Sequence, residues 1–302
     1  MTDQQKGAFF AFLSYAIWGV FPLFWKLLEH VCSMEILLGR VIWSCVFTTV
    51  FILLIGQRKK LIADLRYLWK HKRQFFSLMA AAFFISINWY IYIWAVTHDR
   101  VLESSMGYYI NPIISVVFGM IFFKEKLSRP TIVALFIALL GVLVMTINYG
   151  QVPWASLLLA LSFAIYGVLK KRIVLDATRG LAIETLFILP FALMYYIYLY
   201  SNHSMQFLHE GWQTDVLMMI SGIITAIPLI LFAKGAQIIP MYLLGFIQYV
   251  SPTITFLLGV FLYHEPFTEV EAIAFGCIWT AIAIFSYSSI LEAKKRHTVQ
   301  VK

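Results

Sequence analysis

Charged side chains are scarce in this sequence, and their scarcity excludes an ordinary water-soluble fold. Asp, Glu, Lys and Arg make up 13% of the 302 residues, whereas a soluble domain carries about 25%. Hydrophobic residues account for 61%, and the mean hydropathy is +0.83. Because so few charges cannot cover a surface that faces water, lipid must surround much of the chain.

Cysteines and catalytic motifs are also rare or missing. The three cysteines, Cys32, Cys45 and Cys277, have no CxxC spacing, which disfavours a disulfide framework or a metal site. The seven histidines are scattered, and the sequence contains no GxSxG, HExxH, Walker A or GxGxxG motif. We therefore expect no enzyme activity, no cofactor and no direct use of ATP. A membrane-embedded enzyme is the disfavoured alternative.

Long apolar runs fill most of the sequence. A helix that spans a bilayer needs about 20 largely apolar residues. Ten such runs follow one another with short connections, which predicts an all-α integral membrane protein with ten transmembrane helices. The runs lie at residues 7–28, 34–55, 74–97, 103–122, 130–148, 152–170, 180–200, 215–237, 241–262 and 269–290.

The basic residues gather in alternate connections between these runs. The connections on the side of both chain ends hold nearly all of the Lys and Arg, whereas the opposite set holds only Arg100. The positive-inside rule therefore predicts a multi-pass membrane protein with an even number of helices and both termini in the cytoplasm. Lipid headgroups explain the basic stretch at 58–73 better than nucleic acid does, so no nucleic-acid partner is expected.

The two halves of the sequence resemble each other. Residues 87–128 align without gaps on 227–268, which places Tyr109 on Tyr249 and Pro112 on Pro252. A second match places residues 14–19 on 162–167. Chance similarity between apolar segments is the alternative. Because five helices separate equivalent segments, the repeats must be inverted in the membrane, as in many secondary transporters. The predicted units are residues 7–148, residues 152–290 and a basic cytoplasmic tail at 291–302.

Several motifs resemble one known family. They are Ser14–Gly19, Phe21–Lys26, Asn88–Trp94, Arg100–Pro112, Glu184–Leu186 and Gln248–Pro252. With them the chain resembles the drug/metabolite transporter superfamily, with two EamA-type repeats, and in detail its RarD-type members. The resemblance covers about residues 7–290. It implies ten helices, cytoplasmic termini and an inner-membrane exporter or permease, but it implies no particular substrate.

Two prolines mark the centre of the predicted transporter. Pro112 and Pro252 lie inside helices at equivalent positions of the repeats, and each removes a helix hydrogen bond. Paired interruptions of this kind indicate hinges beside a central site. The alternative is a packing kink without a ligand nearby.

Polar residues occur at helical spacing around these prolines and are candidates for substrate binding. Unpaired polar groups are costly in hydrocarbon, so these side chains should face the protein interior. Hydrogen bonding between helices without a ligand is an equally good interpretation. The candidates are Asn88, Tyr108, Asn111, Gln248 and Ser251, and the stripes also include Ser104, Ser115 and Thr255.

Three basic residues stand within the predicted spans. Lys26 and Lys234 lie near helix ends, where snorkelling to the interface explains them, whereas Arg40 lies about two turns into its helix. As substrate-binding residues they favour an anion or a zwitterion. For Arg40 the alternative is a structural ion pair. Trp94 is the repeat mate of Lys234, so the two are expected to form a cation–π contact across a cavity.

Glu184 is the candidate for coupling transport to the proton gradient. The alternative is that its carboxylate complements the helix dipole or pairs with Arg179. Glu125 and Glu265 close their helices and are expected to cap helices or pin loops.

These features together predict a secondary active transporter of a small metabolite, either amino-acid-like or an organic anion, that works by alternating access and exports its substrate. The alternative substrates are cationic or neutral drugs such as antibiotics, and a passive channel is disfavoured. The expected partners are the substrate, the lipid bilayer and protons, with the chain acting as a monomer or a homodimer.

Overall fold

The computed structural model describes residues 2–97, 101–150, 152–263 and 268–300, and in that part of the chain it is helical without strands. Ten of its helical segments are long and apolar enough to span a membrane. The prediction of an all-α membrane protein with ten spans is therefore confirmed. The elements are α1 Asp3–Gly19, α2 Phe21–Trp25, η1 Lys26–Leu28, α3 Ser33–Leu54, α4 Arg58–Lys70, α5 Lys72–Thr97, α6 Val101–Phe123, α7 Arg129–Tyr149, α8 Trp154–Arg172, α9 Ala177–Ser201, α10 Trp212–Ile238, α11 Met241–Gln248, α12 Val250–Phe261 and α13 Glu269–Gln300.

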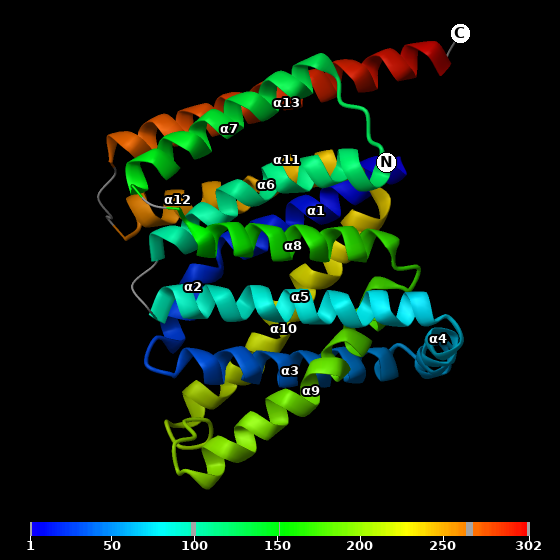
Figure 1. Ribbon diagram of the computed structural model, residues 1–302. Coiled ribbons are helices and arrows are strands. Elements are labelled where there is room, and N and C mark those ends of the chain that lie inside the picture. Colours follow the sequence, from blue (N-terminus) through cyan, green and yellow to red (C-terminus); the bar gives the residue numbers. More distant parts are fainter. Residues whose placement is uncertain (1, 98–100, 151, 264–267, 301–302) are drawn as a thin grey trace.

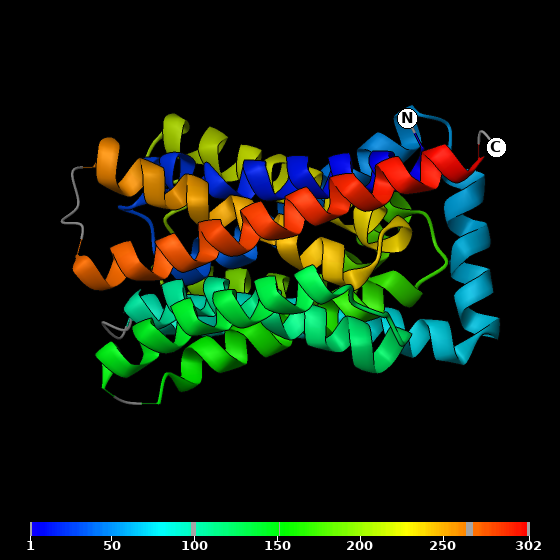
Figure 2. The same cartoon turned by 90° about the horizontal axis from the view of Figure 1, so that it is seen from above.

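Most of the long helices run lengthwise through the body of the molecule, and α4 lies across one end (Figures 1 and 2). Both chain termini lie at this same end, which we call the α4 end. The sequence reading treated residues 58–73 as a basic connection. Instead, residues 58–70 form an amphipathic helix, because apolar residues recur at helical spacing among the basic ones.

Two helix–helix contacts correspond between the two halves of the chain. Helix α1 packs on α10, and α8 packs on α5, which is the same pair with the halves exchanged. The polar bonds in these interfaces also correspond: the Ser14 hydroxyl donates to the Pro228 carbonyl at 2.7 Å, and the Asn88 amide donates to the Ser162 hydroxyl at 3.0 Å. The alignment of the two halves of the sequence pairs Ser14 with Ser162 and Asn88 with Pro228. The halves therefore meet through matched contacts.

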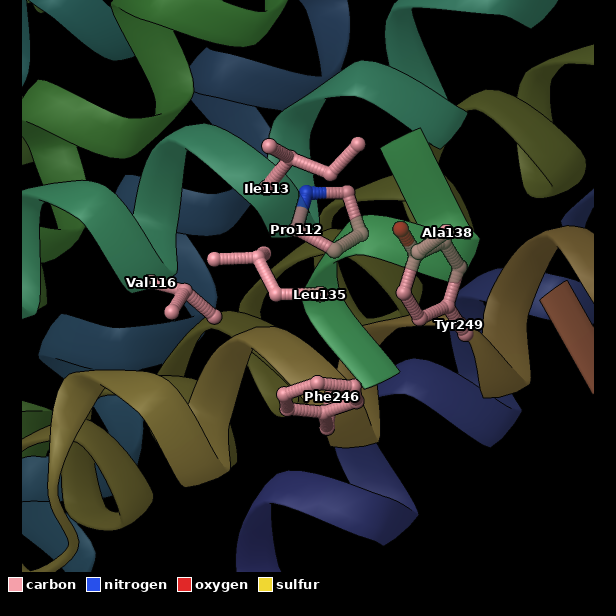
Figure 3. Close-up of a pocket in the computed structure, with 7 residues that line it drawn as sticks. All are labelled: Pro112, Ile113, Val116, Leu135, Ala138, Phe246 and Tyr249. Carbon is pink, nitrogen blue, oxygen red and sulfur yellow. The ribbon is translucent and has the colours of Figure 1, made fainter. Parts of the chain in front are cut away.

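The two paired prolines have different effects. Helix α6 stays continuous through Pro112, whereas the equivalent span is divided just before Pro252 into α11 and α12. Figure 3 shows apolar side chains gathered round Pro112, and the gap that they line has no room for a water molecule. The described surroundings of Pro112 are thus closely packed, and the hinge role of Pro112 and Pro252 stays a prediction.

The carboxylate of Glu125 caps α11. It accepts hydrogen bonds from the backbone N–H groups of Met241 at 2.7 Å and Tyr242 at 3.0 Å, at the positive end of the helix dipole. The prediction that Glu125 caps a helix is therefore confirmed. Glu265, its repeat mate, lies outside the described residues.

We expect Glu125→Ala to lower stability by about 1–2 kcal/mol, because two backbone donors lose their acceptor. The measurement is the thermal unfolding midpoint of the purified protein in detergent. Glu29→Ala is the control, since Glu29 is an exposed carboxylate outside the long helices. Equal midpoints for the two variants would contradict the capping role.

Candidate functional site

Arg40 lies on α3 between two indole rings. Its guanidinium carbon is 4.3 Å from the ring centroid of Trp89 on α5 and 5.5 Å from that of Trp25 on α2. Its Nε atom is buried and has no hydrogen-bond partner in the part of the chain that is described. The guanidinium is therefore in cation–π contact with two indoles, while its Nε–H group is buried without an acceptor among the described residues.

Two tyrosines complete this group, which we call the Arg40 cluster: Trp25, Arg40, Trp89, Tyr92 and Tyr108. The rings of Tyr92 on α5 and Tyr108 on α6 are 6.2 Å apart, and both phenols lie near Arg40. Arg40 lies on the first turns of α3, so the cluster occupies the half of the molecule away from the α4 end (Figure 1). It combines one permanent positive charge with flat aromatic walls and hydroxyl groups.

Repeat mates differ sharply in exposure. Tyr108 is 47% exposed, whereas its mate Gln248 is 6% exposed. Tyr92 is 38% exposed, whereas its mate Phe232 is 1% exposed. At these two pairs the position beside Arg40 is exposed and its mate, toward the α4 end, is buried; we call the side with the buried mates the closed half.

A buried ion pair holds the closed half together. The ammonium of Lys170 on α8 lies 2.7 Å from a carboxylate oxygen of Glu184 on α9, and their side chains are only 1% and 3% exposed. The second carboxylate oxygen of Glu184 is buried without a hydrogen-bond partner among the described residues. Tyr166, one turn before Lys170, interacts electrostatically with Glu184. We call these three residues the Lys170–Glu184 latch.

The alternative interpretation that pairs Glu184 with Arg179 is contradicted, because Glu184 pairs with Lys170. Arg179 instead forms an ion pair with Asp64 of α4 and donates to the side chain of Gln57. The basic run at the end of α8 was interpreted as a cytoplasmic connection, but Lys170 is still inside the helix and points into the protein. A buried cation nearby explains why a carboxylate can be held at this depth.

Aromatic rings and helix-end contacts close the same half. The ring of Tyr166 stacks on Phe232 with centroids 5.6 Å apart, and Trp18 packs against Phe163 and Phe232. Lys171 donates to the carbonyl of Ile239, just after α10, where a positive charge favours the helix terminus. These ring contacts and this hydrogen bond pack the helices together at the α4 end, around the Lys170–Glu184 latch.

Arg40 and Glu184 occupy equivalent places. Helices α3 and α9 are the second spans of their halves; Arg40 lies seven residues after Ser33, and Glu184 lies seven residues after Ala177, where these helices begin. Each of these two helices therefore carries one charged side chain at the same distance from its beginning, a cation on α3 and a carboxylate on α9.

The polar stripes serve helix packing in this structure. The Asn88 amide donates to the carbonyl of Leu159 at 2.8 Å, and the Asn111 amide donates to that of Ala160 at 2.8 Å. The Tyr15 hydroxyl donates to the side-chain carbonyl of Gln248 at 3.5 Å. Ser251 is half-buried on α12, and its neighbour on the stripe, Thr255, donates to Gly19 on α1. Among the stripe residues whose side chains are described, only Tyr108 belongs to the Arg40 cluster, and the side chain of Ser104 lies outside the description.

The remaining predicted binding residues lie apart. Lys26 is exposed, with its ammonium 4.3 Å from the ring centroid of Tyr263, and the Lys234 ammonium is 5.6 Å from the ring centroid of Phe10. Trp94 packs against Trp154 with centroids 4.7 Å apart. Lys234 and Trp94 thus have separate aromatic neighbours, so the expected cation–π contact between them is not seen.

The sequence reading did not place Trp25, Trp89, Tyr92 and Lys170 in the site. For the tryptophans a signal existed, because both lie in motifs that carry the family resemblance. Their contact with Arg40 depends on the packing of α2, α3 and α5, which no local pattern specifies.

Comparisons with known proteins agree with this architecture. The model of the EamA-like transporter family matches residues 5–147 and again residues 152–287. The chain is 45% identical over 298 residues to the uncharacterized transporter YojE of Bacillus subtilis, with 98% of this chain and 99% of that protein covered. It is 36% identical over 293 residues to the protein RarD of Escherichia coli, with 97% and 98% covered.

A more distant relative is the chloramphenicol-sensitive protein RarD of Pseudomonas aeruginosa, which is 29% identical over 304 residues, with 98% of both chains covered. A solved crystal structure superposes with a TM-score of 0.69 over 92% of this chain and 96% of its own, at 17% identity, which shows the fold alone. Two matches to one family model and full-length relatives settle the family. The chain belongs to the EamA-like transporter family of the drug/metabolite transporter superfamily, and it is a RarD-like membrane transporter.

Proposed function

We propose that this transporter is a secondary active exporter of a small organic anion or zwitterion, such as an amino acid, in a bacterial inner membrane. The substrate binds at the Arg40 cluster, and the two halves exchange conformations to give alternating access. The α4 end, with both termini, faces the cytoplasm, because the basic residues gather there. The observation that carries the proposal is the guanidinium of Arg40, held between two indoles with a buried N–H that has no described partner.

The geometry of Arg40 favours a carboxylate. A guanidinium keeps its charge at any physiological pH and presents its N–H groups along a planar edge. Trp25 and Trp89 lie within cation–π distance of the guanidinium, and its buried Nε–H group has no acceptor among the described residues, which a substrate carboxylate would supply. Among the described side chains, which do not include those of residues 101–105, no carboxylate forms an ion pair with Arg40. We propose that a substrate carboxylate pairs with the guanidinium.

The Lys170–Glu184 latch supplies a route to proton coupling. Protonation of the Glu184 carboxylate removes the attraction that holds α8 and α9 together at the closed half. The α4 end then opens while the Arg40 cluster closes, since the repeats exchange conformations. Protonation of Glu184 would thus favour the orientation that is open at the α4 end.

A second candidate substrate class is neutral or cationic drugs, because one relative is named for chloramphenicol sensitivity. A cation would have to compete with Lys170 for Glu184, and a neutral drug would leave the Arg40 charge without a partner. The Arg40 cluster therefore favours the anion or zwitterion.

The test is counterflow in proteoliposomes that contain the wild-type protein. The panel comprises labelled amino acids, organic anions, cationic dyes and chloramphenicol, and protein-free liposomes serve as the control. We expect saturable exchange of at least one anion or zwitterion and none of the dyes. Exchange of dyes or chloramphenicol alone would overturn the assignment of substrate class.

A further inference from the structure

An apolar groove lies beside α4, away from the Arg40 cluster. It has a volume of about 320 Å³ and is lined only by apolar side chains from three helices: Leu65, Leu68 and Trp69 of α4, Phe75 of α5, and Ile183, Leu186 and Phe187 of α9. Apart from the indole N–H of Trp69, these side chains offer a water molecule no hydrogen-bond partner, so the groove suits hydrocarbon.

Helix α4 has the features of a helix that lies in the membrane interface. It runs across the spanning helices at one end of the molecule (Figure 2). Leu65 is 43% exposed and Trp69 is 71% exposed, although both border the groove. Tryptophan is enriched at the level of the lipid headgroups, and amphipathic helices bury their apolar face at that depth.

Positive charge surrounds the mouth of the groove. The ammonium of Lys72 lies 4.2 Å from the ring centroid of Trp69, so a cation stands directly beside the lining. Helix α4 carries five basic residues and a single carboxylate, and that carboxylate, Asp64, is engaged by Arg179. Lys70, Lys72 and Arg73 are all exposed at this end. The rim is therefore cationic, while the floor is apolar.

We propose that this groove binds an acidic glycerophospholipid, with one acyl chain between α4, α5 and α9 and the phosphate at Lys72. A cationic rim over an apolar floor complements an anionic headgroup that carries a hydrocarbon chain. The volume is at the small end of the range for ligand pockets, which fits part of one acyl chain rather than a whole lipid. Ile183, the residue before Glu184, lies in the lining, so the chain packs on the segment of α9 that carries the latch.

The proposal is tested by native mass spectrometry of the full-length protein purified in detergent. The probes are palmitoyl-oleoyl-phosphatidylglycerol, the phosphatidylcholine with the same chains, and oleate. We expect the wild type to bind phosphatidylglycerol about fivefold more tightly than phosphatidylcholine. Leu65→Trp, which fills the groove from an exposed position, should weaken binding of both phospholipids. Lys72→Gln should leave phosphatidylcholine binding unchanged and remove the preference for phosphatidylglycerol.

Matched controls separate this site from lipid bound loosely around the bundle. Leu140→Trp alters another exposed leucine, on α7, and Lys126→Gln removes another exposed lysine; neither should change binding. Equal affinity of the wild type for the two phospholipids would overturn the proposal. So would equal effects of Leu65→Trp and Leu140→Trp, or tighter binding of oleate than of phosphatidylglycerol. None of these outcomes depends on the transported substrate, so the site and the transport proposal can fail separately.

Discussion

Arg40→Ala is expected to reduce counterflow of an anionic substrate at least about 100-fold, because two hydrogen bonds to a charged group are lost together. Arg40→Lys should retain an intermediate rate. A lysine keeps the charge, but its ammonium group is not planar, so it lacks the two parallel N–H donors of a guanidinium. The measurement is the initial rate of substrate exchange in proteoliposomes that contain equal amounts of folded protein.

The control for this prediction is Arg129→Ala, since Arg129 is an exposed residue at the start of α7. It should exchange substrate like the wild type. If Arg40→Ala and Arg129→Ala have rates within about threefold of each other, a difference too small for two lost charged hydrogen bonds, the substrate carboxylate does not bind at Arg40.

Breaking the latch should have the second large effect. Lys170→Ala leaves the carboxylate of Glu184 buried without its cation, which is expected to cost about 3–5 kcal/mol of stability. The double variant Lys170→Met with Glu184→Leu should recover most of that loss, because a buried ion pair can be replaced by apolar groups at little net cost. Thermal unfolding in detergent measures both changes.

Transport distinguishes a coupling role of the latch from a purely structural one. Glu184→Gln keeps the size of the side chain but removes the titrating proton. We expect it to exchange substrate and to lose accumulation driven by a pH gradient. Accumulation at the wild-type level in Glu184→Gln would show that Glu184 does not carry the coupling proton.

The ten spanning helices could be predicted from the sequence, because long apolar runs and alternating loop charge depend on the bilayer rather than on tertiary packing. It also gave Arg40 as a candidate for substrate binding, since a guanidinium two turns into a span needs a partner or a function. The same reasoning treated Lys170 as a loop residue, because the basic run at residues 170–172 conceals that its first member points inward.

Contacts between helices distant in sequence were the least predictable feature. The stripe through Asn111 was equally compatible with a cavity and with helix packing, and only the carbonyl of Ala160 on α8 distinguishes the two in this structure. Similarly, Pro112 and Pro252 remove the same hydrogen bond, yet only the second span is divided, because each proline packs in a different tertiary environment.

Alternating access is the central claim, and the repeat mates Tyr108 and Gln248 test it most directly. In a background without the three native cysteines, Tyr108→Cys and Gln248→Cys are exposed to a membrane-impermeant thiol reagent from each side of oriented vesicles. The account predicts that Tyr108→Cys reacts from the side away from the α4 end, and that Gln248→Cys is protected until transported substrate makes it reactive from the α4 side. If substrate changes the reactivity of neither position, the two halves do not exchange conformations, and the account is contradicted.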